Sequence, residues 1–120
     1  MVTRAARYVV VVDENRVVGF DVTTGINFQI PQNCYLAAPS ILTWMMDVKL
    51  LNSVASLNVL INNVQIYNGT YTTGRYGPIH EVVNPSVLKW GKNTIDFNFT
   101  NSGTVSITIS DIVLWIEVAV

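Results

Sequence analysis

The sequence predicts an all-β protein, an antiparallel β-sandwich of jelly-roll type with roughly eight to ten short strands. Short runs rich in β-branched and aromatic residues recur along the whole chain, separated by Gly, Pro, Asn and Asp. Several runs alternate apolar and polar residues, which is the two-residue period of a half-buried strand. No long stretch has the apolar spacing of an amphipathic helix. Because 120 residues is the size of one domain, we expect a single sandwich over residues 1–120.

The beginning of the chain predicts three strands. Residues 8–12 form a Val-rich run that ends at a polar turn, and residues 17–22 are predicted to return as its hairpin partner. Residues 26–30 alternate apolar and polar side chains, which predicts the third strand. Pro31 ends this strand because proline has no N–H to donate to a neighbouring strand.

The next segment is assigned partly from its context. Residues 31–40 contain two prolines and predict a loop. Residues 41–49 fit either a strand or a helical turn, and the β-rich context favours a strand. A short helical turn is predicted within residues 50–56.

A hairpin and a long loop follow. Residues 57–61 alternate as a strand, Asn62 and Asn63 suggest a turn, and residues 64–66 resume as the hairpin partner. Residues 68–78 are rich in Gly, Thr and Tyr and are predicted to form the longest loop of the protein.

Further strands are predicted towards the end of the chain. Residues 79–83 read as a short strand, and residues 90–93 as a tight turn. Residues 95–99 and 105–109 each place three apolar side chains on one face. Residues 101–103 are predicted to join these two strands as a hairpin loop.

The last strand, residues 112–120, is apolar on both faces. Val113, Trp115 and Ala119 share one face, on which Glu117 is the only charge. A strand that is apolar on both faces has to be covered on both, whereas the outer face of a two-layer sandwich normally meets water. Val113, Trp115 and Ala119 are therefore predicted to lie under a loop or against another subunit.

The composition points to a surface that meets other molecules. Only 12% of the residues are charged, against about 25% in a typical soluble domain, and the net charge is −1. A neutral polar surface suits contact with protein or sugar, although it also fits a simple monomer. The absence of a basic cluster argues against nucleic acid as a partner.

The sequence argues against an enzyme. His80 is the only histidine and Cys34 the only cysteine, so multi-histidine and cysteine-rich metal sites are excluded, and no cofactor is predicted. Cys34 reads as a small buried apolar residue. Asp13, Glu14 and Asn15 offer clustered oxygens for calcium, but a turn between two strands is the favoured interpretation.

The chain also lacks targeting features. No export signal and no apolar stretch long enough to cross a bilayer is visible. We therefore expect synthesis in the cytoplasm, followed by incorporation into a particle or release from the cell.

Three segments within residues 57–99 match a known pattern: LNVLIN, VQI and LKWGKNTI. In this order they resemble the galactose-binding-like jelly-roll families. Gly91 permits the tight backbone of the last segment, and the side chain of Asn93 can bridge the amides of the turn. The resemblance implies a jelly-roll sandwich and carries over no ligand-contacting residue.

Two functions are compatible with these features. The first is a non-catalytic structural or interaction subunit of a larger assembly, for example a virion surface or decoration component, that forms homo-oligomers or binds other subunits. The second is a lectin-like carbohydrate-binding module. The predicted contact residues for a ligand or partner are Tyr67, Asn68, Tyr71, Arg75 and Tyr76, because tyrosines suit both sugars and protein interfaces.

Overall fold

The protein is an all-β sandwich of two antiparallel sheets, with nine strands among the residues that the structure describes, which confirms the predicted fold class. The structure is a computed structural model, and it describes residues 3–18, 23–50, 54–101 and 104–119. The strands are β1 (Arg4–Val12), β2 (Arg16–Val17), β3 (Ile26–Ile30), β4 (Ser40–Leu50), β5 (Ala55–Ile61), β6 (Val64–Tyr71), β7 (Gly74–Val83), β8 (Gly91–Asn101) and β9 (Thr104–Ala119). A single 3-10 turn, η1 (Pro85–Val87), is the one helical element in these ranges.

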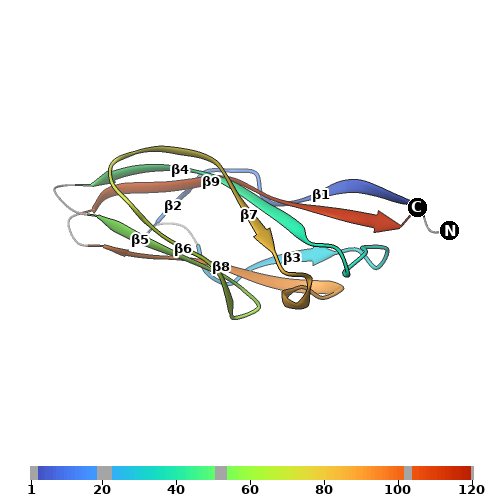
Figure 1. Cartoon of the computed structure of the whole chain (residues 1–120). Coiled ribbons are helices and arrows are strands. Elements are labelled where there is room, and N and C mark those ends of the chain that lie inside the picture. The colour runs from blue at the N-terminus through green and yellow to red at the C-terminus, as the bar shows by residue number, and fades with distance from the viewer. Residues whose placement is uncertain (1–2, 19–22, 51–53, 102–103, 120) are drawn as a thin grey trace.

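The strand order has the nested pairing of a jelly roll. One sheet runs β1-β9-β4-β7, with β2 also paired to β9, and the other runs β3-β8-β5-β6. The first strand therefore pairs with the last, β3 with β8, β4 with β7, and β5 with β6. The chain thus behaves as one long antiparallel hairpin folded over into two layers (Figure 1).

The core lies between the two sheets and follows the alternation in the sequence. Along β4 every second residue is buried, and β3 and β5 also alternate between buried and more exposed side chains. Trp44 of β4 and Phe97 of β8 are fully buried and meet edge to face, with ring centroids 5.6 Å apart. The apolar faces of both sheets are thus buried against each other, which is the main stabilising term of a sandwich.

The segment LKWGKNTI forms the hydrogen-bond network that was expected around Asn93. The side-chain oxygen of Asn93 accepts the N–H of Lys89 at 3.1 Å, and its amide donates to the carbonyls of Lys89 and Gly91 at 2.8 and 3.0 Å. Gly91 has a φ of 84°, a conformation that favours glycine. Asn62 donates to the Asn93 side chain at 2.8 Å, so this network also ties the β5–β6 turn to the start of β8. The turn predicted over residues 90–93 ends at Trp90, because Gly91 already begins β8.

Asn62 and Asn63 both have positive φ, 50° and 65°, and connect β5 to β6 as predicted. Asparagine tolerates this left-handed conformation better than most residues, and it suits the twist of a two-residue hairpin.

Three predictions about connections are wrong. β2 pairs with β9 and not with β1, so residues 17–22 do not form the predicted hairpin partner, and residues 19–22 lie outside the described ranges. Strands β8 and β9 belong to different sheets, so residues 101–103 do not close a hairpin. The strands predicted over residues 105–109 and 112–120 are one strand, β9. An alternating pattern shows which face of a strand is buried but not which strand lies beside it, which explains these errors.

The prediction of a long loop over residues 68–78 is also wrong. Most of residues 68–78 form the end of β6 and the start of β7, and only Thr72 and Thr73 connect them. Both strands lie at sheet edges, where glycine and proline are tolerated because one side of the strand needs no hydrogen-bonded neighbour. In the segment 50–56, the described residues lie in or beside β4 and β5, without a helical turn, and residues 51–53 lie outside the described ranges.

Candidate functional site: the outer face of the β1-β9-β4-β7 sheet

A row of exposed apolar side chains crosses the outer face of this sheet. Tyr8 of β1 pairs with Trp115 of β9, Trp115 with Ile41 of β4, and Ile41 with Val82 of β7. Their exposed fractions are 59% for Tyr8, 46% for Trp115, 43% for Ile41 and 64% for Val82. Because residues opposite each other in a sheet point to the same face, these four side chains lie side by side across four strands.

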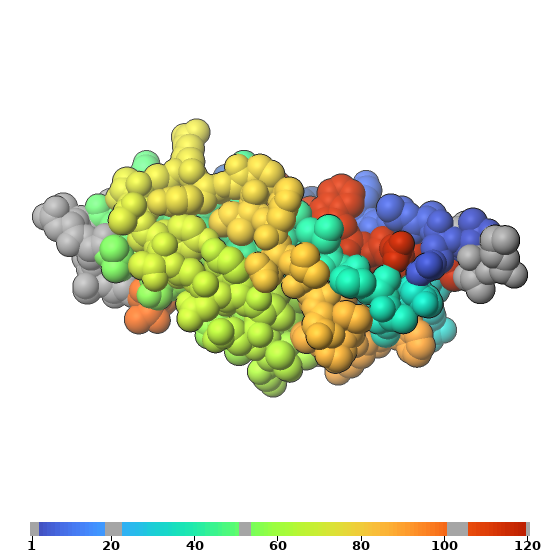
Figure 2. All heavy atoms as spheres, in the orientation of Figure 1, coloured from blue at the N-terminus to red at the C-terminus, as the bar shows by residue number. Residues whose placement is uncertain are grey.

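The neighbouring positions extend this row into a patch. In the next row, Val10 pairs with Val113, Val113 with Thr43, and Thr43 with His80. Figure 2 shows the segments that carry these rows, from β1, β9, β4 and β7, meeting on one surface of the molecule. We call the following residues the outer apolar patch: Tyr8, Val10, Ile41, Met45, Val82, Val113 and Trp115.

Trp115 is held in place at the centre of the patch. Its indole N–H donates to Oγ1 of Thr43 at 3.2 Å, and its ring lies 5.5 Å from the ring of Tyr8 at an angle of 53°. A shallow hollow of about 380 Å³ opens beside it, lined by Ile41, Thr43, Pro78, His80 and Trp115. The contacts with Thr43 and Tyr8 restrict the orientation of the indole ring at the surface.

Irregular pairings mark the border between this patch and a polar hollow on the same sheet, and Met45 lies at this border. The register shifts between Val10 and Val12 in β1, and on both sides of β4 near Met45. Asp111 of β9, at this line, has a φ of 52°. Such β-bulges bend a sheet and increase its local twist.

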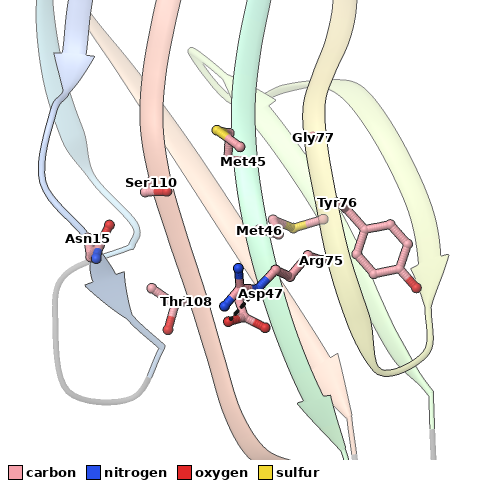
Figure 3. A pocket seen from close by; sticks show the side chains of 9 residues that line it. All are labelled: Asn15, Met45, Met46, Asp47, Arg75, Tyr76, Gly77, Thr108 and Ser110. Atoms are coloured by element: carbon pink, nitrogen blue, oxygen red, sulfur yellow. Dashed lines mark ion pairs between the residues drawn. The ribbon is translucent and has the colours of Figure 1, made fainter.

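The polar hollow lies beyond this line. It has a volume of about 410 Å³ and is lined by Asn15, Met45, Met46, Asp47, Arg75, Tyr76, Gly77, Thr108 and Ser110 (Figure 3). Arg75 and Asp47 point toward each other across β4 and β7, with Nε 3.7 Å from Oδ2. Since this pair is largely exposed, it contributes little to stability.

The predicted tyrosine loop is instead a packed cluster on the opposite side of β7. Tyr67 lies edge-on against Trp44, with centroids 5.2 Å apart, and Tyr71 lies edge-on against Tyr76 at 4.7 Å. The hydroxyls of Tyr67 and Tyr71 are hydrogen-bonded to each other, and the Tyr76 hydroxyl donates to the carbonyl of Thr72 at 2.9 Å. We call Tyr67, Tyr71 and Tyr76 the tyrosine cluster.

The tyrosine cluster packs against the core between the edge strands β6 and β7. Burial, and then the hydrogen bond with Tyr67, raises the pKa of Tyr71 well above that of a free tyrosine. Asn68 faces away from the core on β6, and Arg75 faces the polar hollow, so the five residues predicted to contact one ligand do not share one surface. Contact of individual members with a ligand stays a prediction.

The three predicted interface residues of the last strand do not all lie in the outer apolar patch. Val113 and Trp115 belong to the outer apolar patch. Ala119 lies further along β9, paired with Arg4, and its N–H donates to the carbonyl of Asn33 at 2.7 Å. Sequence reasoning missed Tyr8, Ile41 and Val82, whose exposure to the same face depends on strand pairing that the sequence does not reveal.

The groups considered for chemistry are dispersed. Within the described ranges, no three His, Cys, Asp or Glu side chains lie together. Glu14, considered for calcium, forms an ion pair with Arg16 at 3.3 Å. Cys34 is buried as predicted, and burial raises the pKa of its thiol, which disfavours the reactive thiolate.

None of the described segments is a helix of the length and apolarity required to cross a membrane. No protein-family model matches the chain, and no curated protein matches it either.

Proposed function

We propose that this protein is a non-catalytic interaction subunit of a larger assembly, such as the surface of a particle, and that it associates through the outer apolar patch. The observation that carries the proposal is the row Tyr8–Trp115–Ile41–Val82, four large apolar side chains exposed side by side across four strands. Scattered exposed apolar residues are normal on protein surfaces, but a contiguous patch is typical of an interaction site.

The size of the patch supports this proposal. Large aromatic side chains cover about 150–250 Å² when buried, so the exposed fractions here amount to an apolar area on the order of 500 Å². A standard stable interface buries about 800 Å² on each partner, with a polar rim around an apolar centre. Thr43 and His80, directly beside the row, are suitable rim residues.

Electrostatics also favour association. The chain carries 8 acidic and 7 basic residues and a net charge of −1, so copies of it repel each other only weakly. The nearest ion pairs on this face, Arg4–Glu117 and Asp47–Arg75, are neutral as pairs and lie away from the central row.

The test is the solution mass of the purified chain, measured by light scattering over a range of concentrations. We expect the wild type to exceed its monomer mass of 13.3 kDa. Trp115→Glu and Val82→Glu should each weaken association roughly 30-fold or more, because a charge placed in an apolar contact loses its hydration.

Val64→Glu is the matched control. Val64 is 47% exposed on a strand of the other sheet, so the same change there should leave the mass unchanged. A wild type that stays monomeric at high concentration would contradict the proposal. So would a Trp115→Glu variant that assembles like the wild type.

A lectin-like carbohydrate-binding module is the second candidate. The observation that favours it is the hollow beside Trp115, where an exposed indole face lies next to Thr43 and His80, because sugars stack on aromatic rings and hydrogen-bond to such polar groups. Binding of a glycan array by the wild type, lost in Trp115→Ala, would favour this candidate. Failure to bind any glycan would remove it.

A further inference from the structure

The sheet that carries the outer apolar patch has an open edge. Among the described residues, β1 pairs with β9 along one side and has no strand along its other side. The backbone N–H and C=O groups of an edge strand are a template for pairing with another strand unless the edge is protected.

The other three edges carry protective features. β7 contains Gly74, Gly77 and Pro78, and Pro78 has no N–H to donate. β3 is only five residues long and is followed by Pro31. β6 contains Gly69 and has a register shift in the middle of its pairing with β5.

β1 lacks these features over most of its length. From Arg4 to Val10 its register with β9 is regular, and this stretch contains neither glycine nor proline. Its two charges are Arg4 and Arg7, and Arg4 is directed to its own sheet by Glu117 at 3.7 Å and by the ring of Tyr35, 4.3 Å from its guanidinium carbon.

This strand is also exposed on both faces. The side chains of residues 4–8 are all exposed, although Ala5 and Arg7 pair with the buried Val118 and Ile116 and so point to the inner side of the sheet. Among the described residues, no strand pairs with this edge and the side chains of residues 4–8 stay exposed, so a neighbouring strand finds backbone and side-chain surface available.

We propose that β1 pairs antiparallel with β1 of a second copy of this chain, around a two-fold axis at Tyr8. A copy of itself is the occupant because the strand is self-complementary in this register: Ala6 faces Val10, Arg7 faces Val9, and Tyr8 faces its own equivalent. An aromatic pair opposite each other stabilises a sheet, and no like charges are opposed.

The two registers that move the axis toward the start of β1 are less favourable. Around a two-fold axis, each side chain lies opposite one that points to the same face of the sheet. Moving the axis by one residue along β1 therefore shifts the two strands against each other by two residues. Centring the pair on Arg7 opposes two arginines, which destabilises the pairing. Centring it on Ala6 places Arg4 opposite Tyr8 and leaves Val9 and Val10 unpaired.

This pairing joins the outer apolar patches of two copies, and in this respect it rests on the proposed function. Tyr8 is the last member of the apolar row, so the rows of two copies meet end to end and form one strip across eight strands. The dimer therefore presents a larger apolar surface to the rest of an assembly than either chain alone.

Cysteine cross-linking tests the register. Directly opposed positions alternate between wide and narrow spacing, and at least one type permits a disulfide. In a Cys34→Ala background, mild oxidation should therefore yield disulfide-linked dimers from Tyr8→Cys, from a mixture of Arg7→Cys and Val9→Cys, or from both. Ala6→Cys should stay monomeric on a non-reducing gel.

The outcomes separate this proposal from the proposed function. Cross-linking of Tyr8→Cys that persists in Val82→Glu, a change at the opposite edge of the sheet, supports edge pairing as a distinct contact. Oligomers in light scattering without any Tyr8 or Arg7–Val9 cross-link would overturn edge pairing and leave the proposed function intact. Cross-linking of Ala6→Cys in place of Tyr8→Cys would overturn the register.

Discussion

The tyrosine cluster and the outer apolar patch place the same kinds of side chain in different surroundings. In the tyrosine cluster, Tyr67 packs against Trp44, and its hydroxyl meets that of Tyr71, all within one chain. On the outer face, Tyr8 and Trp115 pack against each other and remain about half exposed. The difference arises from which face of its strand each aromatic residue occupies, so aromatic content alone does not show which aromatic side chains are exposed.

The comparison also distinguishes two energetic roles. Aromatic residues of the cluster close the open side between β6 and β7, and their burial stabilises the fold of the single chain. The aromatic pair of the patch leaves apolar surface in water, which becomes favourable only when a partner covers it. Substitutions in the first region should therefore affect folding, and substitutions in the second should affect association.

The largest contrast is expected between two tryptophans. Trp44→Ala should lower the free energy of unfolding by about 3–5 kcal/mol, because it empties a fully buried site. Trp115→Ala should lower it by about 1 kcal/mol, because half of that side chain already meets water. Urea unfolding at a concentration where the chain is monomeric measures both, and equal losses would show that the patch supports the fold itself.

A smaller contrast is expected when single hydroxyls are removed. Tyr67→Phe should cost about 1 kcal/mol, because the half-buried Tyr71 hydroxyl loses its partner. Tyr8→Phe should change the stability by only a few tenths of a kcal/mol, in line with exposed sites. The same unfolding measurement applies, and a Tyr67→Phe variant as stable as the wild type would argue against the hydrogen bond between the two phenols.

The third contrast is a pH dependence to which the tyrosine cluster contributes. The pKa of Tyr71 is raised in the folded state, so the native chain keeps this proton at a pH where the unfolded chain, with a tyrosine pKa of about 10, releases it. This contribution to stability is complete below pH 10 and declines as the pH rises above it. Tyr71→Phe should show a shallower decline than the wild type in unfolding experiments between pH 9 and 11.5, and parallel curves would contradict this role.

Much of the fold could be predicted from the sequence because its inner strand faces alternate strictly. Residues 26–30 and 57–61 are strands as predicted, since a buried face imposes a two-residue period on the sequence. The strands predicted over residues 64–66 and 79–83 belong to β6 and β7, but the rest of these two strands was predicted as a loop. Residues 68–78 have the glycine and proline content of a loop, and edge strands tolerate such residues.

The candidate site was only half predictable. Val113 and Trp115 stood out because β9 is apolar on both faces, an unusual pattern for a two-layer sandwich. The segments around Ile41 and Val82 show no such pattern. The β4–β9 register places Ile41 beside Trp115, and the β4–β7 register places Val82 beside Ile41. Cross-strand neighbours far apart in sequence are a property of topology, which single-sequence patterns do not encode.

The nested strand order has a consequence for the order in which the protein can fold. β9, the last strand of the sandwich, is a central strand of its sheet and separates β1 from β4. During synthesis, β1 therefore has no neighbour in its own sheet until β9 has emerged. Topologies dominated by such distant pairings fold slowly, typically over milliseconds to seconds. Throughout that interval β1 is unprotected along both edges, so the strand that we propose to join two finished subunits is also the strand most exposed to premature association.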